Sequence, residues 1–276
     1  MWGVNRPDHE PGPVFERCIS NANEPLKSGL AAATDAVVAA AELYEAAGAS
    51  GQLHVVPQTA GIGAVSASDL TKVYTDRMVP ADAPGRMIYV HIYGLSDGRC
   101  PMCLHGRVRT LDHFLPKSLF TFLSVVPLNL VPCCNDCNKT KHNNVPTSAE
   151  AVTMHPYFDA FDDDPWLSAE VLETHPAAFR FYVSPPDWWD AVTAKRAEKH
   201  FDTFGLADLY AQQAGTELSG LSKYLAGLHA NAGDQGVWEH VSEMALSRAH
   251  PHSNCWQAAM YTAMSQSPWF CSEGFH

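Results

Sequence analysis

The chain lacks the features of a disordered, secreted or membrane-spanning protein. Only 17% of its 276 residues are charged and 46% are hydrophobic, a composition far from that of disordered proteins. The most apolar stretch, residues 29–49, is interrupted by three acidic residues, whereas a membrane span needs about 20 continuous apolar residues. The first 14 residues do not combine a basic region with an apolar one. We therefore expect no secretory leader, no membrane contact and a cytoplasmic location.

Basic residues are scarce, with 18 lysines and arginines against 30 acidic residues and a net charge of −12. This balance argues against non-specific coating of DNA, because attraction to phosphate dominates such binding. The charge is unevenly distributed, however. Residues 99–141 contain six basic and two acidic residues, a net charge of +4, and the remainder of the chain carries −16. Phosphate contact should therefore be confined to one site, and a partner protein or a second protomer could strengthen binding.

Cysteine is plentiful, and four of the eight cysteines form two Cys-x-x-Cys pairs, Cys100/Cys103 and Cys134/Cys137. Two such turns can bring four thiolates to one tetrahedral zinc ion, and four sulfur ligands leave no position open for substrate. The pairs therefore predict a structural zinc site. Cys133 could replace Cys134, but the spacing to Cys137 favours Cys134. The alternative is that these residues are unpaired thiols of the core.

Hydrophobic periodicity predicts helices on both sides of the cysteine region. One should run from residue 28 to Ala47 with Gly48 as its cap, and Ser66 with Asp69 predicts a capped helix start. A short strand is expected within residues 177–183. Later helices are expected at residues 190–204, 206–230, 235–249 and 254–267. We expect three segments: a mainly helical flank (1–85), a zinc-containing module (86–158) and a mainly helical C-terminal region (159–276).

Three short strings lie between and just after the cysteine pairs: TLDHFLPKS from Thr110, PLNLVP from Pro127, and CNKTK from Cys137. With the flanking cysteines they make this quarter of the chain resemble the HNH endonuclease family. The resemblance implies a small ββα-metal core, so the expected fold class is α+β, with this core and its four-cysteine zinc held in a mainly α-helical scaffold. It also implies cleavage of nucleic acid with a divalent metal.

Each residue type in these strings suits phosphodiester hydrolysis. His113 is the candidate general base, because imidazole titrates near neutral pH. Asp112 and Asn138 offer the hard oxygen ligands that Mg²⁺ or Mn²⁺ prefers. In the family, the equivalent of Asn129 tethers the loop and orients the catalytic histidine. His142 lies four residues after Asn138, so a continuous helix would place both on one face as metal ligands; a surface histidine near phosphate is equally plausible.

Lys117, Lys139 and Lys141 are the candidate phosphate contacts, although each could be a solvated surface charge. The expected function is hydrolysis of DNA, with RNA as the alternative substrate. A non-catalytic zinc-dependent binding or scaffold protein is the rival hypothesis. HNH proteins with helical extensions often act as effectors of bacterial anti-phage systems beside an ATPase, which implies antiviral defence and an ATPase partner. Homo-oligomers are a further expectation.

Overall fold

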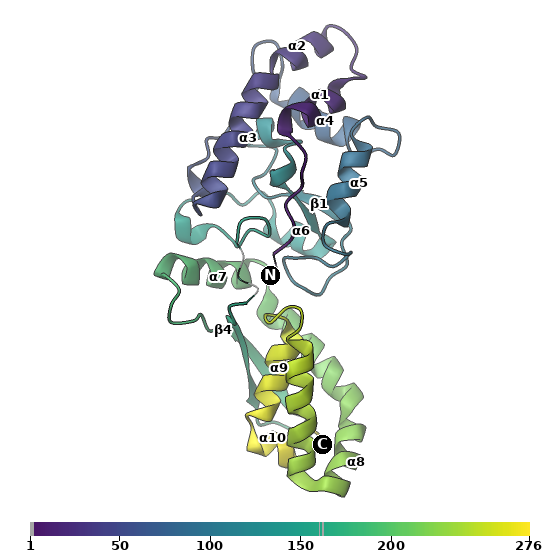
Figure 1. Ribbon diagram of the computed structural model, residues 1–276, viewed down its shortest axis with the longest axis vertical. Helices are drawn as coiled ribbons and strands as arrows, with labels where there is room; N and C mark the ends of the chain where they lie inside the picture. The colour runs from purple at the N-terminus through teal and green to yellow at the C-terminus, as the bar shows by residue number, and fades with distance from the viewer. Residues whose placement is uncertain (1–2, 160, 162) are drawn as a thin grey trace. The chain divides into compact units, whose positions relative to one another are not determined.

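The computed structural model describes residues 3–159, 161 and 163–276. These residues form two compact units (Figure 1): one comprises residues 3–159 and the other the described residues from 161 to 276. The expected N-terminal flank and the expected zinc module thus share one unit. Both units combine helices with a two-stranded antiparallel sheet, so the prediction of a mixed α+β fold is confirmed.

Five α-helices precede the first strand of the N-terminal unit. They are α1 (Pro11–Ile19), α2 (Leu26–Ala32), α3 (Thr34–Ala49), α4 (Ala67–Arg77) and α5 (Arg86–Gly94). The start of α4 follows the prediction: the Ser66 side chain accepts a hydrogen bond from the Asp69 amide at 3.1 Å, and Asp69 accepts one from the Ser66 amide. This reciprocal pair satisfies donors that a helix start leaves without partners.

The predicted end of the helix from residue 28 to Ala47 was wrong. The segment forms two helices, α2 and α3, and α3 continues to Ala49, so Gly48 lies inside the helix instead of capping it. Gly48 has a packing role, because a Cβ atom built there would lie 2.2 Å from the ring of Phe158. Absence of a side chain lets the aromatic ring approach the helix backbone.

A β-hairpin and a short helix follow the helical layer. Strand β1 (Thr110–His113) pairs antiparallel with β2 (Leu130–Cys133), and Asp112 stands opposite Val131. The connection between them contains the 3₁₀ turns η2 (Thr121–Leu123) and η3 (Pro127–Asn129), and α6 (Asn135–Lys141) follows β2 at once. Helix α5 packs against both strands. The hairpin is buried along β2, which matches its apolar sequence.

The C-terminal unit contains a second antiparallel hairpin and four helices. They are β3 (Leu167–Leu172), β4 (Ala178–Val183), α7 (Ala191–Thr203), α8 (Leu206–Arg248), α9 (Trp256–Ser265) and α10 (Pro268–Ser272). The predicted strand is β4, whereas β3 was not predicted. Helix α8 joins two predicted helices across a break at Gly233, whose φ is 62°. Within the described ranges every helix is too short or too polar to cross a lipid bilayer.

Candidate functional site

The four cysteines of the two Cys-x-x-Cys pairs meet in one buried cluster. Their Sγ atoms all lie within 4.8 Å of one another, and those of Cys103 and Cys134 are 3.9 Å apart. Two sulfurs bound to one zinc at about 2.3 Å are about 3.8 Å apart at the tetrahedral angle. The cluster is therefore compatible with a structural zinc ion. Cys133 is not part of it, as the spacing predicted.

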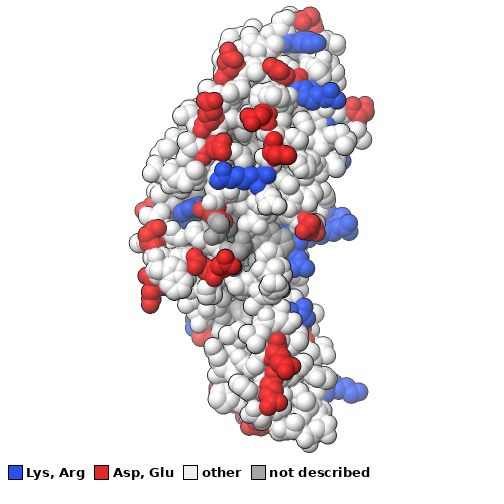
Figure 2. Space-filling model, in the orientation of Figure 1, with Lys and Arg blue, Asp and Glu red and all other residues white. Residues whose placement is uncertain are grey.

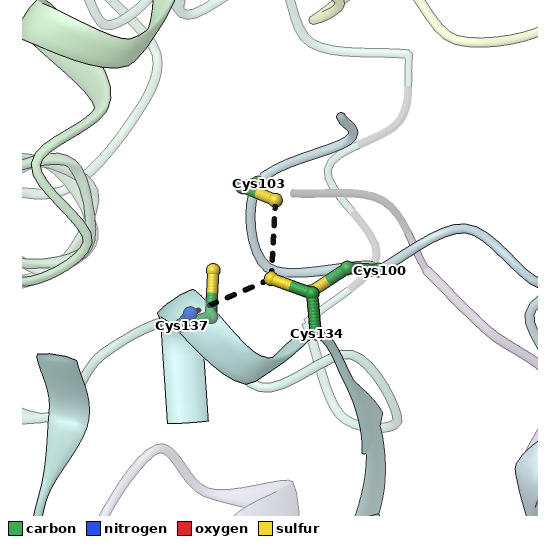
Figure 3. A group of neighbouring side chains, drawn as sticks. All are labelled: Cys100, Cys103, Cys134 and Cys137. Carbon is green, nitrogen blue, oxygen red and sulfur yellow. Dashed lines mark hydrogen bonds between the residues drawn. The ribbon is translucent and has the colours of Figure 1, made fainter. Parts of the chain in front are cut away.

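Two local structures converge on this cluster (Figure 3). Cys100 and Cys103 lie in a turn closed by a bridge between Arg99 and Arg107, while Cys134 caps α6 and accepts a hydrogen bond from the Cys137 amide at 3.4 Å. Hydrogen bonds within the cluster, led by the one with Cys103, lower the pKa of the Cys100 thiol below its usual range. A thiol that ionises easily is suited to metal binding.

Gly106 is a cluster residue that the sequence analysis missed. Its amide donates to Sγ of Cys103 at 3.3 Å, and a Cβ atom built there would lie 2.8 Å from Sγ of Cys134. Glycine thus lets the backbone of the turn approach both sulfurs. A glycine three residues after Cys103 has no distinctive sequence signature, so only the folded structure identifies its role.

A pocket of 460 Å³ lies beside β1 and α6. Six of the predicted site residues line it: Asp112, His113, Lys117, Asn138, Lys139 and His142. Strand β1 supplies the first two of these residues, and α6 with the residue after it supplies the last three. The fold therefore gathers carboxylate, imidazole, amide and ammonium groups, which were predicted from separate strings, around one cavity.

The tautomer of His113 follows from its hydrogen bond. Nε2 of the buried ring lies 2.8 Å from the backbone oxygen of Ser124. A carbonyl oxygen only accepts hydrogen bonds, so Nε2 carries the proton and Nδ1 holds the lone pair. Burial, with a contribution from the charge of Lys117, lowers the pKa of His113 to about 3. The ring is therefore neutral at physiological pH, and Nδ1 is the nitrogen that carries the lone pair.

Two further groups fix the His113 ring, and neither was predicted. The ring of Tyr74 lies edge-on to it, with 4.4 Å between centroids, and the Tyr74 hydroxyl donates to the Leu111 carbonyl at 3.1 Å. Ser124 contributes only its backbone carbonyl. A backbone acceptor has no sequence signature, and Tyr74 reaches the site from α4 by tertiary packing alone.

Asn129 holds together the loop that connects β1 and β2. Its side-chain oxygen accepts from the Leu115 amide at 2.8 Å, and its side-chain nitrogen donates to the carbonyls of Leu115 and Leu123 at 3.0 and 3.3 Å. The Asn129 backbone oxygen accepts from the Phe114 amide at 2.9 Å. These bonds fix the loop that follows His113, so Asn129 supports the pocket without entering it.

The structure gives Lys141 a different role from the predicted phosphate contact. Its Nζ atom lies 2.8 Å from Oδ2 of Asp112 and donates to the His113 carbonyl oxygen at 2.8 Å. The side chains of Lys141 and Asp112 are only 5% and 9% exposed. Lys141 is therefore an internal counter-ion, and the expectation of a phosphate contact there was wrong. Burial still raises the pKa of Asp112 above its ordinary value, although Lys141 opposes this shift.

The remaining candidates lie at the mouth of the pocket. Lys139 is exposed, and Nζ of Lys117 lies 4.5 Å from the centre of the Tyr74 ring. His142 is exposed too, but α6 ends at Lys141, and His142 has a φ of 50° and a ψ of −148°. The helical spacing from Asn138 therefore does not apply. The two residues still line the same pocket because the chain turns there.

Acidic side chains are spread over the face drawn in Figure 2, with basic ones scattered between them. This pattern agrees with the net charge of −12. Near the pocket and the cysteine turn, by contrast, Arg107, Arg109 and Lys139 are exposed. An anion approaching the pocket therefore meets positive charge that most of the sequence lacks.

The chain is similar to Protein ea31 of Escherichia phage lambda, with 34% identity over 167 residues. The matched stretch is 59% of this chain and 56% of the phage protein, so the chain spans little more than half the length of that relative. No protein family profile matches the chain, and no solved structure matches it.

Proposed function

We propose that the protein is a metal-dependent HNH endonuclease that hydrolyses phosphodiester bonds in DNA. The observation that carries the proposal is the placement of His113: its ring lines the pocket, and its bond to the Ser124 carbonyl puts the proton on Nε2 and leaves the lone pair on Nδ1. Asp112 and Asn138 line the same pocket. The order strand, strand, helix with flanking cysteine pairs is the arrangement that the family resemblance implies.

In this proposal His113 Nδ1 takes a proton from the attacking water, and the Ser124 carbonyl keeps the ring oriented while the proton moves. Asp112, Asn138 and His142 offer the carboxylate, amide and imidazole donors suited to a divalent cation such as Mg²⁺ or Mn²⁺. When bound, such a cation supplies positive charge to the phosphate and the leaving oxygen. Lys117 and Lys139 attract and position the phosphate backbone. The cysteine cluster holds zinc and takes no part in the chemistry.

The similarity to a phage protein supports a role in phage biology, and an effector of anti-phage defence working with an ATPase is the context we propose. The rival function is a non-catalytic zinc protein. One observation favours that rival. Lys141 already neutralises the charge of Asp112, which weakens the attraction of Asp112 for a metal cation.

The test is incubation of the purified protein with plasmid DNA and, in parallel, with RNA, in Mg²⁺, Mn²⁺ or EDTA. Wild type should cleave DNA with a divalent metal, and His113→Ala should lose at least about a hundredfold in rate, the range typical of a general base. His250→Ala removes an exposed histidine of the other unit and serves as the matched control. Cleavage of RNA alone would move the substrate to RNA. Equal cleavage rates for wild type and His113→Ala would refute the assignment of His113 as the general base. No cleavage of either substrate would favour the non-catalytic rival.

A further inference from the structure

A second group of potential metal ligands lies in the N-terminal unit, away from the cysteine cluster and the pocket. Asp8 and His9 belong to the segment before α1, and His91 lies in α5. The fold brings these residues together across 82 positions of sequence. We propose that Asp8, His9 and His91 form a second, exchangeable site for a divalent transition metal, with Zn²⁺ as its first occupant.

The geometry supports this proposal. Nε2 of His9 lies 2.8 Å from Nδ1 of His91, the two rings are perpendicular, and Oδ1 of Asp8 lies 3.7 Å from the same Nδ1 atom. One nitrogen, oxygen or sulfur atom from each residue falls within 4.8 Å of the others. Two atoms bound to one zinc at about 2.0–2.1 Å are about 3.4 Å apart at the tetrahedral angle. The imidazoles need to separate by only about 0.6 Å, a small rotation of exposed side chains.

The donor set selects the class of metal. Two imidazoles and one carboxylate suit Zn²⁺, Co²⁺ or Ni²⁺, whereas Mg²⁺ prefers oxygen ligands alone. Three protein ligands leave positions for water. The side chains of His91 and Asp8 are 45% and 82% exposed, so the metal can enter and leave, in contrast to one enclosed by the buried cysteines.

Both sides of the site have a fixed backbone. The amide of Val4 donates to the Pro156 carbonyl at 2.9 Å, and Nε of Arg6 donates to the Tyr157 carbonyl at 2.8 Å, so the N-terminal segment is anchored before it reaches Asp8. On the other side, α5 packs against β1 and β2. A metal ion would clamp the segment of residues 3–10 onto α5.

The competing interpretation is a plain N–H···N hydrogen bond between two neutral imidazoles, with Asp8 nearby. A measurement of zinc binding distinguishes this interpretation from a metal site. Equilibrium dialysis against micromolar free Zn²⁺ should give one more zinc ion per chain for wild type and the His250→Ala control than for His91→Ala and His9→Ala. Asp8→Asn should weaken the second site at least tenfold. Asp8 and His91 are exposed and His9 is half-buried, and none of them belongs to the core, so these variants should fold.

Co²⁺ substitution assigns each ion to its site. Thiolate-to-cobalt absorption, which reports the cysteine cluster, should be identical in wild type and His91→Ala, and hydrogen exchange of residues 3–10 should slow with added metal only in wild type and the control. Equal zinc counts in wild type and His91→Ala would overturn the proposal. Neither outcome depends on nuclease activity.

Discussion

Replacing Lys141 by methionine removes the charge of a buried ion pair and keeps most of the length of the side chain. Lys141 and Asp112 are so little exposed that solvent screening scarcely weakens their interaction. Removal of one partner of a buried pair costs about 3–5 kcal/mol, because the other charge stays buried without compensation. The variant also removes a donor from the His113 carbonyl. We expect Lys141→Met to lower the stability of the N-terminal unit by about 3–5 kcal/mol at pH 7.5.

The pH dependence of this loss has a defined sign. The pKa of Asp112 is raised in the folded protein even with Lys141 present, and loss of the ammonium raises it further. The penalty of an ionised Asp112 is therefore present at neutral pH and disappears as the pH falls through the folded-state pKa. The difference between wild type and variant should shrink on acidification.

The assay must report the stability of the N-terminal unit, which contains the ion pair. Every tryptophan that the structure describes lies in the C-terminal unit, at positions 166, 188, 189, 238, 256 and 269. Tryptophan fluorescence would therefore follow the wrong part of the chain. Hydrogen exchange of peptides covering β2 and α6, measured across a urea series with zinc held constant, gives the free energy of opening at the pair.

Three comparisons complete the experiment. Lys139→Met, on the same helix but exposed, should change stability by no more than about 0.5 kcal/mol. Lys141→Met combined with Asp112→Asn should recover about 2 kcal/mol relative to the sum of the single changes. Millimolar Mn²⁺ should stabilise Lys141→Met more than the double variant, since the cation replaces the missing charge at Asp112. A Lys141→Met protein as stable as Lys139→Met would refute the buried-pair reasoning.

Three further outcomes are expected. The pKa of His113 is about 3 in the folded protein and about 6.5 in the unfolded chain. Its contribution to stability is therefore present above pH 6.5 and is lost as the pH falls. Between pH 8 and 5.5, wild type should lose about 1.4 kcal/mol more than His113→Gln in denaturant titrations. Cys103→Ser should lose the tightly bound zinc in elemental analysis, whereas Cys133→Ala should retain it. Gly48→Ala should destabilise the unit by about 1–3 kcal/mol despite the better helix propensity of alanine, and Phe158→Ala should relieve the clash in a double variant; an unchanged melting temperature for Gly48→Ala would contradict this packing.

The cysteine cluster could be predicted from the sequence because its determinants are local. A Cys-x-x-Cys turn places two sulfurs together whatever surrounds it, and two turns close one site. The Ser66 cap is local in the same sense, since residues three apart satisfy each other at a helix start. Both predictions needed no knowledge of tertiary packing, and the structure contains both features.

The wrong predictions concern residues whose roles depend on tertiary contacts. Gly48 was taken as a helix end because glycine often ends helices, yet its role is to admit Phe158, more than 100 residues away. Lys141 was predicted to contact phosphate, although it lies four residues after the buried Cys137 and therefore on the inward face of α6. That spacing was a usable signal. His142 could have been placed outside the helix too, because Asn143, Asn144 and Pro146 follow it.

The short helix α6 links the cysteine cluster to the pocket. It has seven residues, and an isolated helix of that length is not stable in water. Its first turn is held by Cys134 and Cys137, and its last residue, Lys141, reaches Asp112 and the His113 carbonyl. A metal bound by the cysteines would therefore fix the positions of Asn138 and Lys141 without touching the pocket. Removal of that metal should release the Asp112–Lys141 pair before the hairpin itself unfolds, because α6 connects the cysteine cluster to the pocket.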